Sequence, residues 1–303
     1  MKKEILFFCA LFLASSLNAA DTTLMRKHFN AIINTPEPRN FLNIESLNLV
    51  ADYVASEFNK YGDSTVFQEF EVDSRKYKNV ITSFGPKDAQ RIIVGAHYDV
   101  CGDQDGADDN ASGVVALLEF ARLLKGVELK YRVDLVAYTL EEPPFFGTNE
   151  MGSYFHANYL FKNSIPVYGM ICLDMIGYYS DEKKSQSYPL GILKLIYGGK
   201  GDYITVVRCY NGGQFAKEAK RELKHSESPI KVKSFKGPKK LNGIAFSDHL
   251  SYWRFGYSSL FITNTGFYRN PNYHQIGDTL SSLDFNRMAQ AVDAVFETIT
   301  SIE

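Results

Sequence analysis

Two hydrophobic patterns alternate along this chain: short, nearly continuous apolar runs, and longer segments with an apolar residue at every third or fourth position. The continuous runs are typical of strands buried on both faces of a sheet, and they occur at 91–96, 132–140 and 167–176. The second pattern predicts amphipathic helices at 46–61, 112–124, 152–161, 214–223 and 283–302. Shorter apolar or alternating segments predict further strands at 65–72, 77–83, 191–198, 203–210 and 257–263.

This order of elements predicts the fold class. Strands that alternate with helices along a chain form a sheet with helices packed on its faces. We therefore expect an α/β three-layer sandwich, with a central mixed, mostly parallel twisted sheet flanked by helices. Because no repeat, low-complexity tract or linker divides the sequence, we expect residues 21–303 to form a single domain.

The first 20 residues have the composition of a secretory signal peptide. Lys2 and Lys3 precede an apolar run at 5–14, and small residues lead to an expected cleavage site near Ala19 or Ala20. A membrane span is the alternative, but it needs about 20 apolar residues and this run is shorter. We expect an exported chain, periplasmic or secreted, with no membrane span after cleavage.

Charge and cysteine content narrow the class of protein further. Without positions 1–20, the 33 basic and 35 acidic residues become 31 and 34, a formal net charge near −3. No nucleic acid or other polyanion is therefore expected as a partner. The mature chain keeps Cys101, Cys172 and Cys209, an odd number, so at most one disulfide forms and its pairing stays open.

Polar residues lie just beyond the ends of three predicted buried strands. His97 and Asp99 follow the first strand, Glu141 and Glu142 follow the second, and Asp174 ends the third. Open α/β sheets bind their ligands at the carboxyl ends of the strands. We therefore expect these side chains to converge on one region.

A turn of small residues with two adjacent carboxylates, Gly106-Ala-Asp-Asp-Asn-Ala-Ser-Gly113, lies between the first two of these strands. Asp and Asn are common in turns and at helix N-caps, so the turn alone is equally consistent with a structural role. Together with the residues at the strand ends, it supplies the carboxylate that a two-metal site needs as a bridge.

Histidine nitrogen and carboxylate oxygen are ligands that Zn²⁺ accepts. The candidate ligands in this sequence are His97, Asp108, Glu142, Asp174 and His274. In this hypothesis Asp108 bridges two ions. His97 and Asp174 complete the ligand set of one ion, and Glu142 and His274 complete that of the other.

The doublet Glu141-Glu142 separates two roles between neighbouring carboxylates. One residue at a strand end can turn to a metal while the other stays free for proton transfer, and we assign Glu141 as the general base. Asp99, two residues after His97, is expected to accept the other imidazole N–H of that ligand and orient it.

Five stretches of the sequence occur in an order known from one family. They are Gly95-Ala-His-Tyr-Asp99, Gly106-Ala-Asp-Asp-Asn-Ala-Ser-Gly113, Glu141-Glu142 with Gly147, Leu173-Asp-Met-Ile-Gly177, and Ser247-Asp-His249 followed by Tyr273-His274. In these stretches the chain resembles the exported dizinc aminopeptidases over roughly residues 40–300. Their superfamily includes glutaminyl cyclases and glutamate carboxypeptidase-like ectodomains.

The resemblance implies a zinc exopeptidase fold of the phosphorylase/hydrolase-like type, two zinc ions on the five ligands named above, and Glu141 as base. It also implies that the Asp108–Asp109 peptide bond is cis. Two features depart from the family pattern, Pro143-Pro144 at a pocket wall and the insertion at 181–188.

Three further residues near the site motifs are candidates for the substrate pocket: Asp248, Tyr178 and Phe267. Aromatic residues beside site motifs can line an apolar side-chain pocket, although core packing is an equal interpretation for each. His28, His156 and His225 are interpreted as surface, core or loop residues, and His249 is not placed among the ligands.

The leading functional hypothesis is hydrolysis of the N-terminal residue of peptides that have a free N-terminus. The same site can cyclise an N-terminal glutamine when only one zinc ion is held, so glutaminyl cyclase is the alternative. A non-catalytic binding ectodomain is a third interpretation, but no ligand or base of the family pattern is missing. The sequence leaves open the preferred N-terminal residue, the oligomeric state and the resident metals in the cell.

Overall fold

A computed structural model describes residues 19–303 of the chain. The predicted signal peptide therefore lies outside the described residues, apart from Ala19 and Ala20. Within the described residues, no helix is both long and apolar enough to cross a bilayer.

The sheet has eight strands in the order β1-β2-β4-β3-β5-β8-β6-β7. The bounds of the strands are β1 Ser64–Val72, β2 Arg75–Phe84, β3 Arg91–His97, β4 Arg132–Tyr138, β5 Val167–Leu173, β6 Ile204–Cys209, β7 Val232–Gly237 and β8 Ser259–Thr263. The central pairs β4-β3, β3-β5 and β5-β8 are parallel, as is β6-β7, whereas β1-β2, β2-β4 and β6-β8 are antiparallel. The prediction of a mixed, mostly parallel sheet is confirmed.

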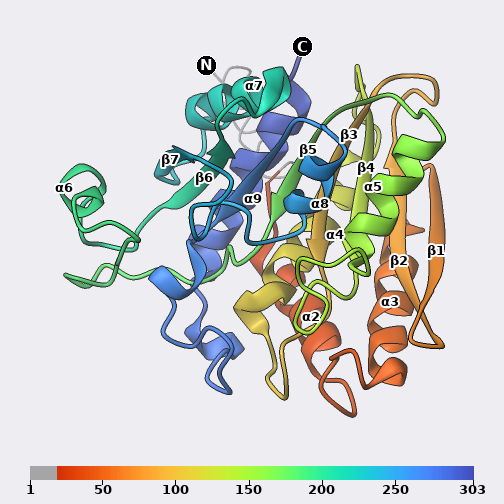
Figure 1. The fold of residues 1–303 in the computed structure, drawn as a ribbon, viewed down its shortest axis with the longest axis horizontal. Helices are drawn as coiled ribbons and strands as arrows, with labels where there is room; N and C mark the ends of the chain where they lie inside the picture. Colours follow the sequence, from red (N-terminus) through yellow and green to blue (C-terminus); the bar gives the residue numbers. More distant parts are fainter. Residues whose placement is uncertain (1–18) are drawn as a thin grey trace, which may run out of the picture.

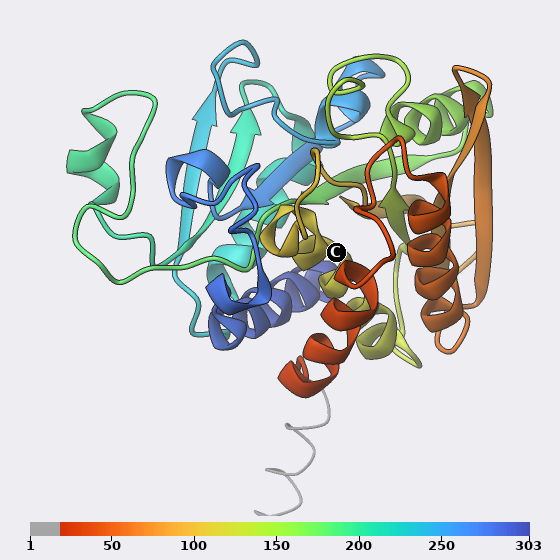
Figure 2. The same ribbon diagram turned by 90° about the horizontal axis from the view of Figure 1, so that it is seen from below.

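Helices cover both faces of this sheet (Figure 1). Their bounds are α2 Thr22–Ile33, α3 Ile44–Phe58, α4 Ser112–Leu124, α5 Gly152–Lys162, α6 Leu193–Tyr197, α7 Gly213–His225, α8 His249–Arg254 and α9 Phe285–Ser301, with shorter turns η1 Ala107–Ala111, η2 Gly266–Tyr268 and η3 Leu280–Ser282. Figure 2 shows α2, α4 and α9 on one side of the sheet and α5 and α8 on the other. The three-layer arrangement follows directly from this packing.

The larger hydrophobic core lies between the sheet and the layer that contains α4. All residues of α4 except Arg122 are buried, because α2, α3 and α9 pack around it and the sheet closes its remaining side. The smaller core lies on the opposite face under α5 and α8, around Tyr138, Tyr252 and Trp253. A sheet covered on both faces explains why its central strands are apolar almost without interruption.

One predicted strand is wrong. Residues 191–198 contain the short helix α6 and not a strand. This segment belongs to an excursion between β5 and β6 that extends away from the body of the molecule in both views (Figures 1 and 2). A short apolar run fits either structure by pattern alone, and here no neighbouring strand supplies hydrogen bonds.

Candidate active site and metal centre

The polar residues predicted at the strand ends converge as expected. His97 is the last residue of β3, Asp174 follows β5, and Glu141 and Glu142 follow β4, all at the carboxyl edge of parallel strands. His274 reaches the same place from the loop between η2 and η3. All five side chains belong to groups whose ligand atoms lie within 4.8 Å of one another.

The carboxylate of Asp109 lies between two imidazoles. Its Oδ1 is 3.4 Å from Nε2 of His97, and its Oδ2 is 3.3 Å from Nε2 of His274. Asp109 is only 3% exposed, and it sits in the irregular turn η1 with φ −109° and ψ 91°, outside the helical range. One buried carboxylate thus joins two histidine sites.

Each histidine has a second carboxylate near the same nitrogen. Nε2 of His97 is 3.6 Å from an oxygen of Asp174 and 3.8 Å from an oxygen of Glu141. Nε2 of His274 is 3.1 Å from an oxygen of Glu142. The arrangement is therefore two ligand clusters that share Asp109.

Asp108, the bridging ligand of the sequence hypothesis, does not face the histidines, whereas its neighbour Asp109 does. Oδ1 of Asp108 accepts hydrogen bonds from the backbone N–H groups of Gly177 and Tyr178, and Oδ2 accepts from the side-chain amides of Asn264 and Asn270. Four donors hold this carboxylate on the other side of the turn. The cis peptide bond is likewise Asp109–Asn110 and not Asp108–Asp109.

The turn η1 is held in place by Asp278, which the sequence did not single out. Its two carboxylate oxygens accept the backbone N–H groups of Asp108 and Asp109, each at 2.9 Å. Burial raises the pKa of Asp278 to about 8. A carboxylate 169 residues away in the sequence therefore fixes the backbone from which Asp109 projects.

A second positioning residue, Arg39, comes from the connection between α2 and α3. Its guanidinium is buried and donates to the backbone carbonyls of Tyr98, Asp105 and Gly106. These contacts join the segment after His97 to the start of η1. Arg39 lies on the N-terminal side of the five sequence stretches that indicate the site. The spacing of those stretches therefore did not predict a role for it.

Asp99 contacts His97 by a different group from the one predicted. Nδ1 of His97 lies 3.2 Å from the backbone oxygen of Asp99, and its distance to the carboxylate is longer, 3.6 Å. The carboxylate oxygens of Asp99 accept the backbone N–H groups of Glu141 and Glu142, at 3.2 and 3.1 Å. Asp99 thus orients the histidine with its main chain and the glutamate doublet with its side chain.

Three residues beside the site have left-handed backbone conformations that side chains rarely adopt. Leu140 precedes Glu141 with φ 59°, Met175 follows Asp174 with φ 56°, and His274 itself has φ 55°. Such residues cost free energy and persist where the surroundings fix them, commonly at functional sites. Their position here is consistent with a backbone that the fold constrains so that Glu141, Asp174 and His274 point toward the same cluster.

The concentration of acids shifts the pKa values of the cluster. Burial raises the pKa of Glu142 to about 7, and burial together with the neighbouring carboxylates raises that of Glu141 well above its usual value. Burial alone would lower the pKa of His274, but Asp109 and Glu142 outweigh it and raise the value to about 10. The carboxylates repel one another, and positive charge relieves that repulsion.

These residues fit divalent cations by their donor chemistry. Buried polar atoms that have no hydrogen-bond partner among the described residues include Nε2 of both histidines, Oδ2 of Asp109, Oε1 of Glu142 and Oδ1 of Asp174. Unpartnered buried polar atoms are costly, and nitrogen and oxygen ligands with this convergence suit zinc. The residues of this cluster therefore fit a divalent metal centre.

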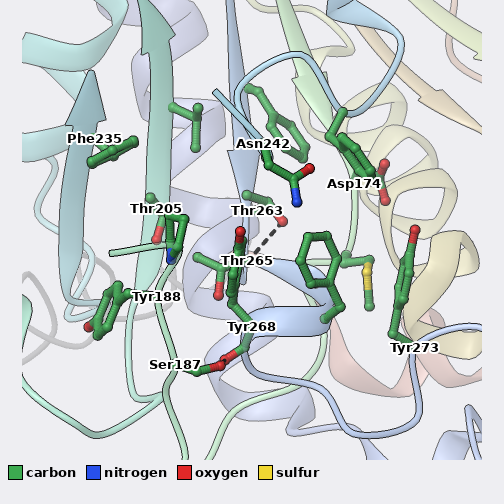
Figure 3. Close-up of a pocket in the computed structure, with 18 of the residues that line it drawn as sticks. Asp174, Ser187, Tyr188, Thr205, Phe235, Asn242, Thr263, Thr265, Tyr268 and Tyr273 are labelled. Atoms are coloured by element: carbon green, nitrogen blue, oxygen red, sulfur yellow. Dashed lines mark hydrogen bonds between the residues drawn. The ribbon is translucent and has the colours of Figure 1, made fainter. Parts of the chain in front are cut away.

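A cavity of about 370 Å³ opens from this cluster (Figure 3). Asp109, Glu141, Glu142, Asp174 and His274 lie at one end of it. Phe267 lines the cavity, whereas Asp248 and Tyr178, also predicted for a substrate pocket, do not. Asp248 is fully buried behind the site, and the backbone N–H of Tyr178 donates to Asp108.

The cysteines Cys101, Cys172 and Cys209 are all free thiols in the structure. His156 and His249 were not predicted to be metal ligands, and both are buried. Nδ1 of His156 forms a hydrogen bond with the hydroxyl of Tyr252, and Nε2 of His249 forms one with the backbone carbonyl of Ile244.

Fold and site together define the class of protein, and the match to a family model agrees with it. Residues 79–299 match the model of peptidase family M28. The chain therefore belongs to peptidase family M28.

Two relatives illustrate its place in the family. The chain is 40% identical over 291 residues to the uncharacterized protein YfbL of Escherichia coli strain K12, an alignment that covers 93% of this chain and 89% of the relative. It is 29% identical over 237 residues to a probable leucine aminopeptidase of Trichophyton verrucosum, covering 73% of this chain and 55% of the fungal protein.

Solved structures of both enzyme classes share the fold. A leucine aminopeptidase precursor from Bacteroides thetaiotaomicron has a TM-score of 0.72 at 19% identity, covering 95% of this chain and 99% of that one. A glutaminyl cyclase from the same organism has a TM-score of 0.69 at 20% identity, with coverage of 94% and 100%. A zinc aminopeptidase from Bacillus subtilis has a TM-score of 0.57 at 24% identity, with coverage of 75% and 50%.

Proposed function

We propose that this chain is a zinc-dependent aminopeptidase that holds two metal ions and removes the N-terminal residue of peptides. The observation that carries the proposal is the position of Asp109, whose two carboxylate oxygens each face Nε2 of a different histidine. A carboxylate shared by two ligand clusters is what a two-metal site requires.

The ligand set that we propose replaces Asp108 of the sequence hypothesis by Asp109. His97, Asp174 and Asp109 form one cluster, and His274, Glu142 and Asp109 form the other. Bound zinc would supply a Lewis acid that polarises the scissile carbonyl and lowers the pKa of water.

Glu141 is the base in this proposal. Its carboxylate lines the cavity, and the backbone N–H that it donates to Asp99 fixes its position. Burial raises its pKa well above the usual value, which favours a group that takes up a proton. Glu141 accepts the proton of the attacking water and passes it to the nitrogen of the leaving amine.

The peptide's free α-amine belongs at the acidic end of the cavity. An ammonium group is attracted by the carboxylates there, and the remaining cavity beyond Asp174 receives the first side chain. This arrangement favours hydrolysis of peptides with a free N-terminus.

Glutaminyl cyclase is the alternative, and substrate turnover separates the two. We expect the protein to release leucine from a leucyl peptide, and N-acetylation of that peptide to stop the release. We expect no conversion of a glutaminyl peptide to the pyroglutamyl form. Ammonia from the glutaminyl peptide without leucine from the leucyl peptide, together with one zinc per chain, would assign the protein as a cyclase.

A non-catalytic binding ectodomain is disfavoured because every proposed ligand and the proposed base lie together at the cavity. Metal without any turnover of leucyl or glutaminyl peptides would support that interpretation instead.

We also propose that the chain is exported and processed, on the grounds of the charged, apolar and small-residue segments at its start. Mass spectrometry of the periplasmic or secreted protein should find an N-terminus at Ala20 or Asp21. A chain that keeps its first residues and stays in the cytoplasm would contradict this.

A further inference from the structure

One row of polar side chains crosses four neighbouring strands along the cavity. Thr263 of β8 pairs with Thr205 of β6, and Thr205 pairs with Lys233 of β7. Asp174 follows the last residue of β5 that pairs with β8, so it begins the row beside Thr263. All four residues line the cavity, and Figure 3 shows Asp174 and Thr205 on opposite sides of Thr263.

The two threonines in this row have hydrogen-bond capacity that the described residues do not use. Oγ1 of Thr263 accepts the backbone N–H of Thr265 at 3.0 Å, which leaves its O–H free to donate. Oγ1 of Thr205 has no partner among residues 19–303, although the residue is only 5% exposed. Buried hydroxyl groups without partners are unfavourable, so the row is suited to a ligand that carries acceptors.

Lys233 places a positive charge at the end of the row remote from the metal ligands. Its Nζ donates to the backbone oxygen of Tyr197 and lies 3.6 Å from the ring centroid of Tyr203. No acidic side chain of the described residues lies within 4.0 Å of it; the nearby Asp202 forms its ion pair with Lys231.

Arg269 lies behind this end and does not line the cavity; its guanidinium donates to Gln186 and to the backbone carbonyl of Tyr203. Its guanidinium carbon lies 4.5 Å from the ring centroid of Tyr203, and its Nη2 is buried without a partner among the described residues. The cavity therefore has carboxylates at one end and the Lys233 ammonium at the other. A ligand with an amine at one end and a carboxylate at the other matches both.

We propose that this site prefers peptides whose N-terminal residue is acidic, with glutamate favoured over aspartate. The inference rests on the proposed aminopeptidase function. Three strand spacings separate Asp174 from Lys233, about 14 Å between their backbones. The α-amine lies at the acidic end, and the side-chain carboxylate accepts hydrogen bonds from the threonine hydroxyls and the Lys233 ammonium.

An apolar first residue uses a different part of the same cavity. Val207, Phe235 and Phe261 form a neighbouring row two positions farther along the strands. Leucine can pack on this row, but it leaves the hydroxyls and the ammonium without a partner. A site built with buried donors discriminates against ligands that cannot satisfy them.

The test compares two nearly isosteric peptides that differ in charge, a glutamyl and a glutaminyl peptide, with a leucyl peptide as the reference for aminopeptidase activity. We expect kcat/KM for the glutamyl peptide to exceed that for the glutaminyl peptide by about 10-fold or more, since charge-assisted hydrogen bonds are strong. Lys233→Met keeps the apolar stem and should bring this ratio close to one.

Two further variants sharpen the test. Lys233→Glu should reverse the preference and favour a lysyl over a glutamyl peptide. Lys236→Met changes an exposed lysine of the same strand that does not line the cavity, and it should leave the ratio unchanged.

Each outcome separates this inference from the proposed function. Equal rates for glutamyl and glutaminyl peptides, or a ratio that Lys233→Met does not alter, would overturn the acidic preference while leucine release still supports an aminopeptidase. No release of a first residue from any of the peptides would overturn the aminopeptidase function and the inference with it.

Discussion

The carboxylates of the adjacent residues Asp108 and Asp109 lie on opposite sides of the turn η1. Asp109 faces His97 and His274, whereas Asp108 accepts four hydrogen bonds from residues of other loops. Asp109 is therefore positioned to bind metal, whereas Asp108 stabilises the conformation of the turn.

Exchanging each of these carboxylates should have a different effect. Asp109→Asn removes the shared negative ligand, so we expect most of the bound metal and the activity to be lost. Asp108→Asn removes a buried ionised acceptor and should lower the free energy of unfolding by about 2–4 kcal/mol. Elemental analysis and denaturant unfolding measure the two effects.

Asp105→Asn is the matched control, because Asp105 is an exposed carboxylate just before the same turn. It should change neither metal content nor stability. Full metal content in Asp109→Asn together with metal loss in Asp108→Asn would restore Asp108 as the bridge.

Removal of metal should abolish activity and lower the melting temperature. Four carboxylates, Asp109, Glu141, Glu142 and Asp174, are buried close together, and cations that bind only the folded state stabilise it. We expect chelation to produce both losses and added zinc or cobalt to reverse them. An unchanged activity and melting temperature after chelation would rule out the metal centre.

The neighbouring glutamates should separate catalysis from metal binding. Glu141→Gln preserves size and should retain both metals while turnover falls by roughly 10²-fold or more. Glu142→Ala should lose metal, because the Glu142 carboxylate lies 3.1 Å from Nε2 of His274. Turnover near the wild-type value in metal-loaded Glu141→Gln would show that another group is the base.

Acid should destabilise the fold through His156, a buried residue outside the metal cluster. Its Nδ1 lies 2.6 Å from the hydroxyl oxygen of Tyr252, and burial lowers its pKa from 6.5 to about 4. Between these values the unfolded chain binds a proton that the folded chain excludes, so stability falls as the pH falls. The expected loss from pH 6.5 to 4 is about 3 kcal/mol.

Unfolding free energies of His156→Gln across this range test the effect, since glutamine does not titrate. The variant should lose about 3 kcal/mol less than the wild type over the same pH interval. His225→Gln, at an exposed helix end, should follow the wild type. Parallel curves for wild type and His156→Gln would contradict the assignment.

Local sequence patterns determined most of the secondary structure and the general place of the site. The apolar runs correspond to β3, β4 and β5, which are buried on both faces. Such strands are apolar at almost every position, so the sequence alone predicts them. Parallel strands then bring the residues after them to one edge, so the sequence alone indicates that His97, Glu142 and Asp174 lie together.

Tertiary structure alone decided which carboxylate of the turn faces the histidines. The sequence places Asp108 and Asp109 one residue apart, and nothing local says which of them meets Gly177, Asn264 and Asn270. The backbone of η1 leaves the helical range at Asp109 because Asp278 and Arg39, far away in the chain, hold the turn. The direction in which the Asp109 side chain points depends on these distant contacts. Residue type and spacing along the sequence do not predict them.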